Sequence, residues 1–283
     1  MLRTRVITAV VILLVLVGML FFAPASAWSL FVLAIALAGC WEWSRLCGFS
    51  RTAQSIYLLL TGVLGGAVLM VQLRAPENLF RDIALAVFVV AAVFWIVVAP
   101  LWLRGKWRPA PPFAALAGWL VVWPTWFAFI LLREIGPWIL LATAAIVWIA
   151  DVAAYFAGRR FGKRKLAPAI SPGKSWAGVY GALVAVAIYG IVLAIVAHTA
   201  ASPLTPIFRP AFGLPAILAM LLLTALSVVG DLLESWMKRG AGRKDSSSLL
   251  PGHGGVLDRI DALTSTLPLA ALGLSLAARY QGG

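Results

Sequence analysis

The chain has 283 residues, of which 63% are hydrophobic and only 12% are charged, and its mean hydropathy is +0.98. A soluble domain could not bury so much apolar surface, since globular proteins are about half apolar. The formal net charge of +13 does not indicate nucleic-acid binding, because Lys and Arg are concentrated in short loops between apolar runs. Composition therefore excludes a soluble globular protein and predicts one that lies largely in lipid, with no nucleic-acid partner.

Apolar runs recur along the chain, and they are long enough, or nearly so, to cross a hydrocarbon core about 30 Å thick. Backbone groups in that core must be satisfied within each segment, which favours helices, and the alternation expected of barrel strands is absent. The fold class is therefore all-α: a polytopic integral membrane protein with about nine transmembrane helices. We predict these spans at residues 6–23, 28–46, 55–73, 83–103, 113–132, 137–157, 177–197, 213–231 and 262–279.

The first apolar run follows Arg3 and Arg5 and ends in the sequence APASA, which also resembles a cleaved secretory signal. The run is long for a signal, however, and many more spans follow it. We therefore interpret it as an uncleaved first helix and treat residues 1–283 as a single membrane-embedded domain.

Basic residues are divided unequally between the two sides of these spans. With the N-terminus in the cytoplasm, most of the 23 Lys and Arg residues face inward, and this asymmetry sets the orientation of short-loop proteins. The two large polar loops, 158–176 and 232–261, then share the cytoplasmic side. We expect a multi-pass protein of a bacterial-type inner membrane.

Half of the ten acidic residues fall within the stretch 231–261. Four polar residues there follow the i, i+3, i+4, i+7 spacing of one helical face, namely Asp231, Glu234, Ser235 and Lys238. This polar face begins where an apolar span ends. By contrast, the first four acids of the chain stand at loop or helix edges and are interpreted as solvated: Glu42, Glu77, Asp82 and Glu134.

Asp258 and Asp261 lie one turn apart at the start of the last span. Such a pair can hold a divalent cation, and Mg²⁺ prefers carboxylate oxygens completed by water and substrate phosphates. The alternative is helix capping, because acids favour the helix N-terminus. Capping explains one acid but not a second, nor Asp231 on the preceding helix. Since ionisable residues at membrane depth are usually functional, we predict a Mg²⁺ site formed by Asp231, Asp258 and Asp261.

Gly254 and Gly255 stand directly before the last span, after His253. Backbone amides without side chains can approach a phosphate closely, especially before a helix, although an ordinary turn is the alternative. His253 is interpreted as a phosphate ligand or a proton carrier, against the alternative of a local hydrogen bond.

The other polar loop follows Asp151 and Tyr155, which lie one turn apart at the inner end of a span. An acid at this depth requires a polar cavity or a partner. Basic residues of the loop are candidates for binding phosphate, with topological anchoring as the alternative. The sequence GKS at 173–175 is similar to the end of a P-loop, but Pro168 replaces the first glycine and no strand is expected before it, so an ATPase is excluded.

The sequence SWMKRGAGRKDSSSLLPGHGGVLDRID, residues 235–261, resembles the signature of the phosphatidate cytidylyltransferase (CDP-diacylglycerol synthase) family. That pattern is S-x-x-K-R-x-x-x-x-K-D, a spacer, and H-G-G-x-x-D-R-x-D. VVGDLLES, DVAAYFAGRRFGKRKLAPAISPGKSWAG, LRTRVITAVVI and WEWSRLCGF extend the likeness over nearly the whole chain. Ala177 departs from the acidic or amide residue common in relatives, and Ser246–Ser248 replaces a more varied spacer, so neither is given a role.

The resemblance implies transfer of the cytidylyl group of CTP to phosphatidic acid at the cytoplasmic membrane face, which gives CDP-diacylglycerol and pyrophosphate for phospholipid biosynthesis. The resemblance implies Mg²⁺ as a cofactor and a second, monovalent cation beside it. It is also compatible with a homodimer. It places catalytic helices and cytoplasmic loops in 136–283 and N-terminal helices in 1–135. The implied catalytic residues are Asp231, Lys238, Lys244, Asp245, His253, Asp258 and Asp261. The implied substrate-binding residues are Asp151, Tyr155, Lys163, Lys165, Ser171, Lys174, Ser235, Arg239, Gly254, Gly255 and Arg259.

Three other functions would use some of the same sequence features. A transporter would place charges near mid-membrane on several helices, often in inverted repeats, whereas here they gather at one end. A CTP-dependent kinase of a polyprenol or phytol is closer, but HGGVLDRID together with SPGKSWAG favours the cytidylyltransferase. A structural scaffold should tolerate the loss of Asp258.

Overall fold

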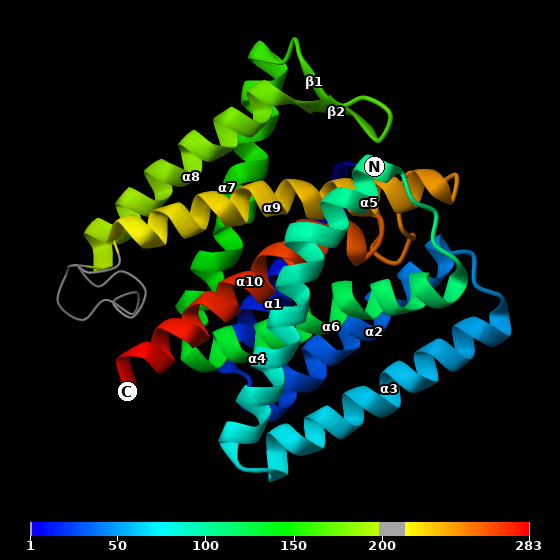
Figure 1. The fold of residues 1–283 in the computed structure, drawn as a ribbon, viewed down its shortest axis with the longest axis vertical. Helices are drawn as coiled ribbons and strands as arrows, with labels where there is room; N and C mark the ends of the chain where they lie inside the picture. Colours follow the sequence, from blue (N-terminus) through cyan, green and yellow to red (C-terminus); the bar gives the residue numbers. More distant parts are fainter. Residues whose placement is uncertain (1, 198–212, 283) are drawn as a thin grey trace.

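The computed structural model describes residues 2–197 and 213–282, which form a bundle of helices with one small hairpin (Figure 1). Eight described helices are long and apolar enough to cross a membrane, and Val6–Phe22 adds a shorter apolar one. The prediction of an all-α polytopic membrane protein is confirmed. The helices are α1 (Leu2–Phe22), α2 (Ala25–Leu46), α3 (Arg51–Arg74), α4 (Glu77–Val93), η1 (Phe94–Val98), α5 (Ala99–Gly105), α6 (Pro111–Ile135), α7 (Pro137–Phe161), α8 (Trp176–Ala197), α9 (Gly213–Gly240) and α10 (Leu257–Gly282).

Local sequence explains several helix ends. The Ser50 side chain accepts a hydrogen bond from the Ala53 amide and so caps α3. Proline stands in the first turn of both α6 and α7, where its missing N–H costs nothing. The predicted span 83–103 corresponds to a continuous run of α4, η1 and α5, in which η1 is a π-helical segment.

Helix α6 lies at the centre of the bundle and packs against α2, α4, α7 and α10. Large aromatic side chains fill the core around it, and their indole N–H groups donate to backbone carbonyls of neighbouring helices. Trp43 of α2 donates to the Ala114 carbonyl at 2.7 Å, and Trp126 of α6 donates to the Ser29 carbonyl at 3.3 Å. These bonds fix α2 against α6, and this places Glu42 of α2 inside the bundle.

Our expectation that no strand precedes the GKS sequence was wrong. β1 (Lys165–Ala167) and β2 (Ser171–Ser175) form an antiparallel hairpin between α7 and α8. This hairpin is unlike a P-loop, in which a strand leads into a phosphate-binding turn. Instead, the Ser175 hydroxyl accepts a hydrogen bond from the Gly178 amide, so the last residue of GKS stabilises the start of α8.

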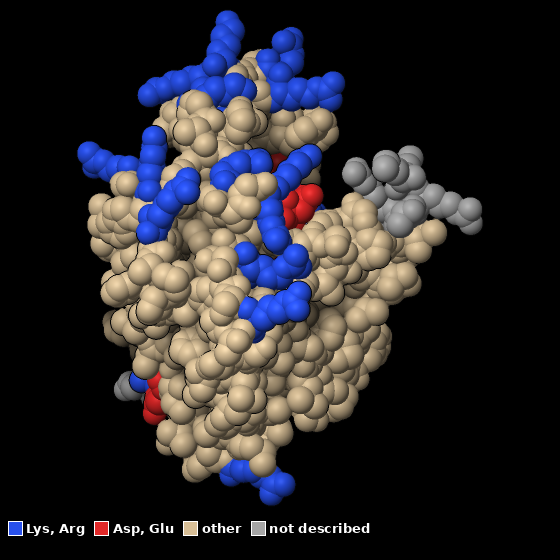
Figure 2. Space-filling view, turned by 90° about the vertical axis from the view of Figure 1, so that its right-hand side faces the viewer, with Lys and Arg blue, Asp and Glu red and all other residues tan. Residues whose placement is uncertain are grey.

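The two large polar loops lie at the same end of the molecule, as predicted. The hairpin lies at the top of Figure 1 and the α9–α10 connection at its right, and Figure 2 views the molecule from the right-hand side of Figure 1. Lys and Arg side chains are spread over this end, and a few acidic side chains lie in a hollow between them (Figure 2). We call this region, which comprises the hairpin, the last turn of α9 and the α9–α10 connection, the basic end.

Candidate functional site

Helices α9 and α10 approach each other very closely just below the basic end. A Cβ atom on Gly230 would come within 2.7 Å of the Asp261 carbonyl oxygen and 2.6 Å of the Ser265 hydroxyl. The Ser265 hydroxyl donates to the Leu226 carbonyl at 2.8 Å and joins the two helices. Because Gly230 has no side chain, the acidic residues that follow it on α9 face the first turns of α10.

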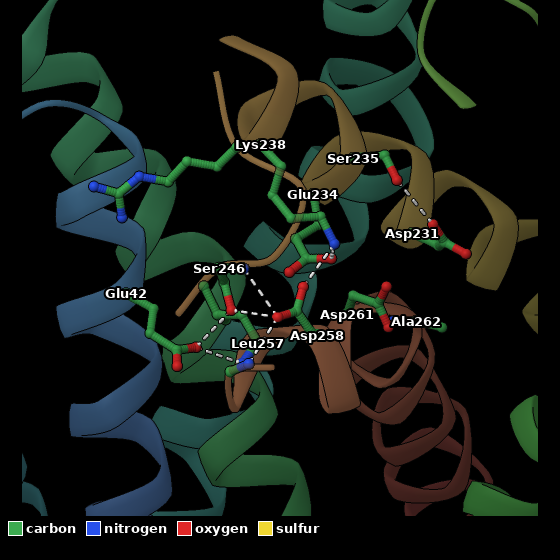
Figure 3. A network of polar contacts seen from close by, with 12 residues as sticks. Glu42, Asp231, Glu234, Ser235, Lys238, Ser246, Leu257, Asp258, Asp261 and Ala262 are labelled. Atoms are coloured by element: carbon green, nitrogen blue, oxygen red, sulfur yellow. Dashed lines mark hydrogen bonds and ion pairs between the residues drawn. The ribbon is translucent and has the colours of Figure 1, made fainter. Parts of the chain in front are cut away.

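A buried ion network links these two helices. The Lys238 ammonium contacts Glu234 at 2.8 Å and Asp258 at 2.7 Å (Figure 3). The side chains of Glu234 and Asp258 are only 5% and 4% exposed. Sequence spacing correctly predicted that Glu234 and Lys238 share a face of α9, but Glu234 was not assigned to the site. One oxygen of Glu234 is buried without a hydrogen-bond partner among the described residues.

Asp258 is held by the loop before its own helix. Its Oδ2 atom accepts hydrogen bonds from the Ser246 amide, the Ser246 hydroxyl and the Gly255 amide, at 2.8–2.9 Å. Its Oδ1 atom contacts Lys238. Both oxygens are thus engaged with the protein. For Asp258 these contacts fit the alternative of helix capping better than the role of a metal ligand.

The interpretation of Glu42 as a solvated edge residue was wrong. Its side chain is completely buried, and its carboxylate lies within hydrogen-bonding distance of four donor groups in the α9–α10 loop and at the start of α10. Figure 3 shows two of them, on Ser246 and Leu257. The donors are the hydroxyls of Ser246 and Ser247 and the amides of Val256 and Leu257. A Glu inside a predicted apolar span is a signal of a buried partner, but the sequence does not say which partner.

The glycines before α10 allow the loop to pack closely against Glu42 and Asp258, because they have no side chains. Gly254 has a positive φ of 84°, a conformation that suits glycine. A Cβ on Gly255 would lie 2.0 Å from the Ser246 hydroxyl and 2.3 Å from a Glu42 oxygen. The Gly255 amide already donates to Asp258, so here it is not free to bind a phosphate. Beside them, Nδ1 of His253 is buried without a hydrogen-bond partner among the described residues.

A second, more open group of charges joins the hairpin to α9. Lys174 of β2 pairs with Asp231 at 2.5 Å, and their side chains are 23% and 28% exposed. The Ser235 hydroxyl donates to Asp231 at 3.1 Å. Asp151 of α7 is exposed and interacts electrostatically with both Asp231 and Lys174. The structure therefore brings together four predicted site residues from two distant parts of the chain, Asp151 and Lys174 from one and Asp231 and Ser235 from the other.

The remaining predicted site residues are spread over the basic end. Tyr155 is exposed, and its hydroxyl accepts a hydrogen bond from Arg159. Ser171 is half-buried in β2. The other side chains are exposed and lie between α7 and β1, on the hairpin, on the last turn of α9, on the α9–α10 loop or on α10: Lys163, Lys165, Arg239, Lys244, Asp245 and Arg259. The five basic residues among them add to the positive charge of the basic end, and Asp245 adds one exposed carboxylate.

The predicted three-carboxylate metal site does not form in this arrangement. Among the described residues, no three His, Cys, Asp or Glu side chains form a group that could hold a metal ion. Asp258 is saturated by other partners, as described above. Asp231 and Asp261 do interact electrostatically, and Figure 3 shows Asp261 on the side of the network that faces Asp231. Two carboxylates with water and phosphate oxygens suit Mg²⁺, so the donor chemistry of this pair fits the ion.

Comparison with known proteins identifies the family of this chain. Residues 3–277 match the model of the cytidylyltransferase family. A phosphatidate cytidylyltransferase of Pseudomonas aeruginosa is 39% identical, with 96% of each chain covered. One of Haemophilus influenzae is 34% identical over 95% of this chain and 96% of that protein, and one of Brucella suis is 36% identical over 96% and 92%. With a match over nearly its whole length, this chain belongs to the cytidylyltransferase family.

Proposed function

We propose that the protein transfers the cytidylyl group of CTP to phosphatidic acid and forms CDP-diacylglycerol and pyrophosphate. The observation that carries this proposal is the similarity, over about 95% of the chain, to relatives named phosphatidate cytidylyltransferase. The apolar helices place the enzyme in a lipid bilayer, where its lipid substrate is dissolved. We place the basic end in the cytoplasm and the protein in the inner membrane, because short loops rich in Lys and Arg stay inside.

The reaction joins two anions, so the protein must first reduce their repulsion. A phosphate oxygen of phosphatidic acid attacks the α-phosphorus of CTP, the bond to the β-phosphate oxygen breaks, and pyrophosphate leaves. Lys174 is the best-placed cation for the phosphates, because it is partly exposed and the carboxylate with which it pairs, Asp231, is also partly exposed. Lys238 is held by Glu234 and Asp258, so we assign it to the support of the site instead.

The remaining chemistry requires little covalent help from the protein. The attacking phosphate is already ionised near neutral pH, so no general base is needed, and His253 is better interpreted as a phosphate ligand. The exposed cations Arg239, Lys244 and Arg259 attract the triphosphate to this end. The main task of the site is then to hold two substrates in line, as in other phosphoryl transfers.

We propose Asp231 and Asp261 as the residues that would hold Mg²⁺. The ion would neutralise charge on the triphosphate and on the departing pyrophosphate. Asp258 is left out of this set because its oxygens are engaged by Lys238, Ser246 and Gly255. The second, monovalent cation stays a prediction from the family resemblance.

Purified protein in lipid nanodiscs, supplied with phosphatidic acid, Mg²⁺ and radiolabelled CTP, tests the function. With label in the α-phosphate we expect the label to enter the lipid fraction; with label in the γ-phosphate we expect it to remain water-soluble as pyrophosphate. The opposite result, with γ-label in the lipid, would identify a CTP-dependent kinase. No lipid label from either nucleotide would reject both enzymes.

A further inference from the structure

We propose that Glu42 is a positioning residue for the transfer site, which acts by holding the loop Ser246–Val256 and the first turn of α10 in one conformation. Glu42 lies in α2, far along the chain from the predicted site residues. Yet its partner Ser246 is 204 residues away. Its effect on turnover rests on the proposed function, whereas its effect on loop structure does not.

Each carboxylate oxygen of Glu42 has a matched pair of donors. Oε1 accepts from the Ser247 hydroxyl at 2.5 Å and the Val256 amide at 2.9 Å. Oε2 accepts from the Leu257 amide at 2.7 Å and lies 3.1 Å from the Ser246 hydroxyl. One backbone amide therefore donates to each oxygen, and both amides come from the N-terminus of α10. An isosteric glutamine could accept from only one of them.

The chemistry of the helix N-terminus explains why a carboxylate is stable here. A buried charge is costly unless it is paired or fully hydrogen-bonded, and among the described residues Glu42 forms no ion pair with Lys or Arg. The first amides of a helix are unpaired donors with partial positive charge. Glu42 supplies the matching anion for α10, and the α10 dipole in turn stabilises Glu42.

Glu42 and Asp258 act on the same segment from two sides. The Ser246 hydroxyl lies 3.1 Å from Glu42 and 2.9 Å from Asp258, and a hydroxyl can donate its proton to only one of them at a time. Together the two carboxylates engage the amides of residues 246 and 255–257. These amides are thereby withheld from substrate phosphate. The conformation that carries His253, Asp258 and Asp261 is thus fixed from α2.

The Glu42→Gln variant tests this proposal, because it keeps the shape and places an NH₂ group against one of the two amides. We expect amide hydrogen exchange at residues 255–257 to rise at least about tenfold without substrate, since a lost hydrogen bond opens this turn. We expect kcat per folded, monodisperse enzyme to fall about 100-fold, because small displacements of reacting groups have effects of this size. The KM for CTP should change less than kcat.

Two further variants keep the test decisive if Glu42→Gln folds poorly. Ser247→Ala removes one hydroxyl donor from Glu42 and should produce smaller changes in the same direction. Asp82→Asn is the matched control, because Asp82 pairs with Arg279 at the far end of α10, about 30 Å away along the helix axis. It should leave both exchange at 255–257 and kcat unchanged.

The outcomes separate this proposal from the proposed function. Unchanged exchange at residues 255–257 in both Glu42→Gln and Ser247→Ala would overturn the positioning role, whatever the activity. So would a lower yield of folded protein with normal kcat and KM in the folded fraction, because that result describes a purely structural residue. Faster exchange in a protein that never transfers cytidylyl groups would reject the function and keep the role of Glu42 in loop structure.

Discussion

Two groups of acidic residues lie at the basic end, and they differ in how completely the protein satisfies them. The buried group comprises Glu42, Glu234 and Asp258 with Lys238, and the Asp258 side chain is 4% exposed. The open group comprises Asp151 and Asp231 with Lys174, and the Asp231 side chain is 28% exposed. All three buried acids lie on helices that the bundle holds together, whereas the open group joins α7 and α9 to a hairpin.

The difference indicates a division of labour between the two groups. Removing charges from water is tolerated only where ion pairs and hydrogen bonds replace the lost hydration. The buried group accordingly has many protein partners, although one oxygen of Glu234 has no hydrogen-bond partner among the described residues. Charges in the open group keep part of their hydration and have fewer fixed partners. They can exchange a protein partner for a phosphate or a metal ion at a small cost. We therefore expect the buried group to control structure and the open group to contact ligands.

Asp258→Asn should have the largest effect, because it breaks the buried group. The variant leaves Lys238 with one carboxylate instead of two, and it places an NH₂ group where amides and a hydroxyl now donate. Removing one partner of a buried ion pair typically costs about 3–5 kcal/mol. We expect a large loss of thermal stability in detergent together with loss of cytidylyl transfer. Wild-type stability would contradict the structural role assigned to the buried group.

Asp231→Asn should separate activity from stability. Asp231 pairs with Lys174 in the open group, and such partly exposed pairs contribute only about 0–1 kcal/mol. We therefore expect an unfolding temperature close to wild type and a loss of transfer of about 100-fold or more, the size found for a preorganised polar group. A titration of activity with Mg²⁺ should also shift to higher concentrations. Normal turnover with an unshifted Mg²⁺ titration would remove Asp231 from the proposed metal site.

The sequence predicted the helices well because their signal is local. Apolar runs of sufficient length recur in the chain, and each predicted span corresponds to a helical segment of the structure. Helical spacing also placed Asp231, Glu234 and Lys238 on one face of α9. The small hairpin was missed, since three- and five-residue strands carry little pattern. The last helix starts at Leu257, five residues before the predicted span, so Asp258 and Asp261 lie within it.

The partners of the acidic residues could not be predicted, because they depend on packing between distant segments. Nothing near Glu42 in the chain indicates that it meets Ser246 and the start of α10. Equally, the i, i+3 spacing of Asp258 and Asp261 suggested two ligands for one metal, but the structure turns Asp258 toward Lys238. Spacing within a helix determines which residues share a face. It does not determine which neighbouring helix competes for them.

Of the three substitutions, Lys174→Met should have the smallest effect on activity and stability. It tests whether the open group binds the nucleotide. Removing the ammonium leaves Asp231 partly solvated, so we expect little change in stability. The KM for CTP should rise about tenfold, the effect of losing one charge-assisted phosphate contact of roughly 1.4 kcal/mol. Lys174→Arg keeps the positive charge and should recover most of the affinity. If both variants keep the wild-type KM, the phosphates bind elsewhere on the basic end, and the exposed cations Arg239, Lys244 and Arg259 become the residues to test.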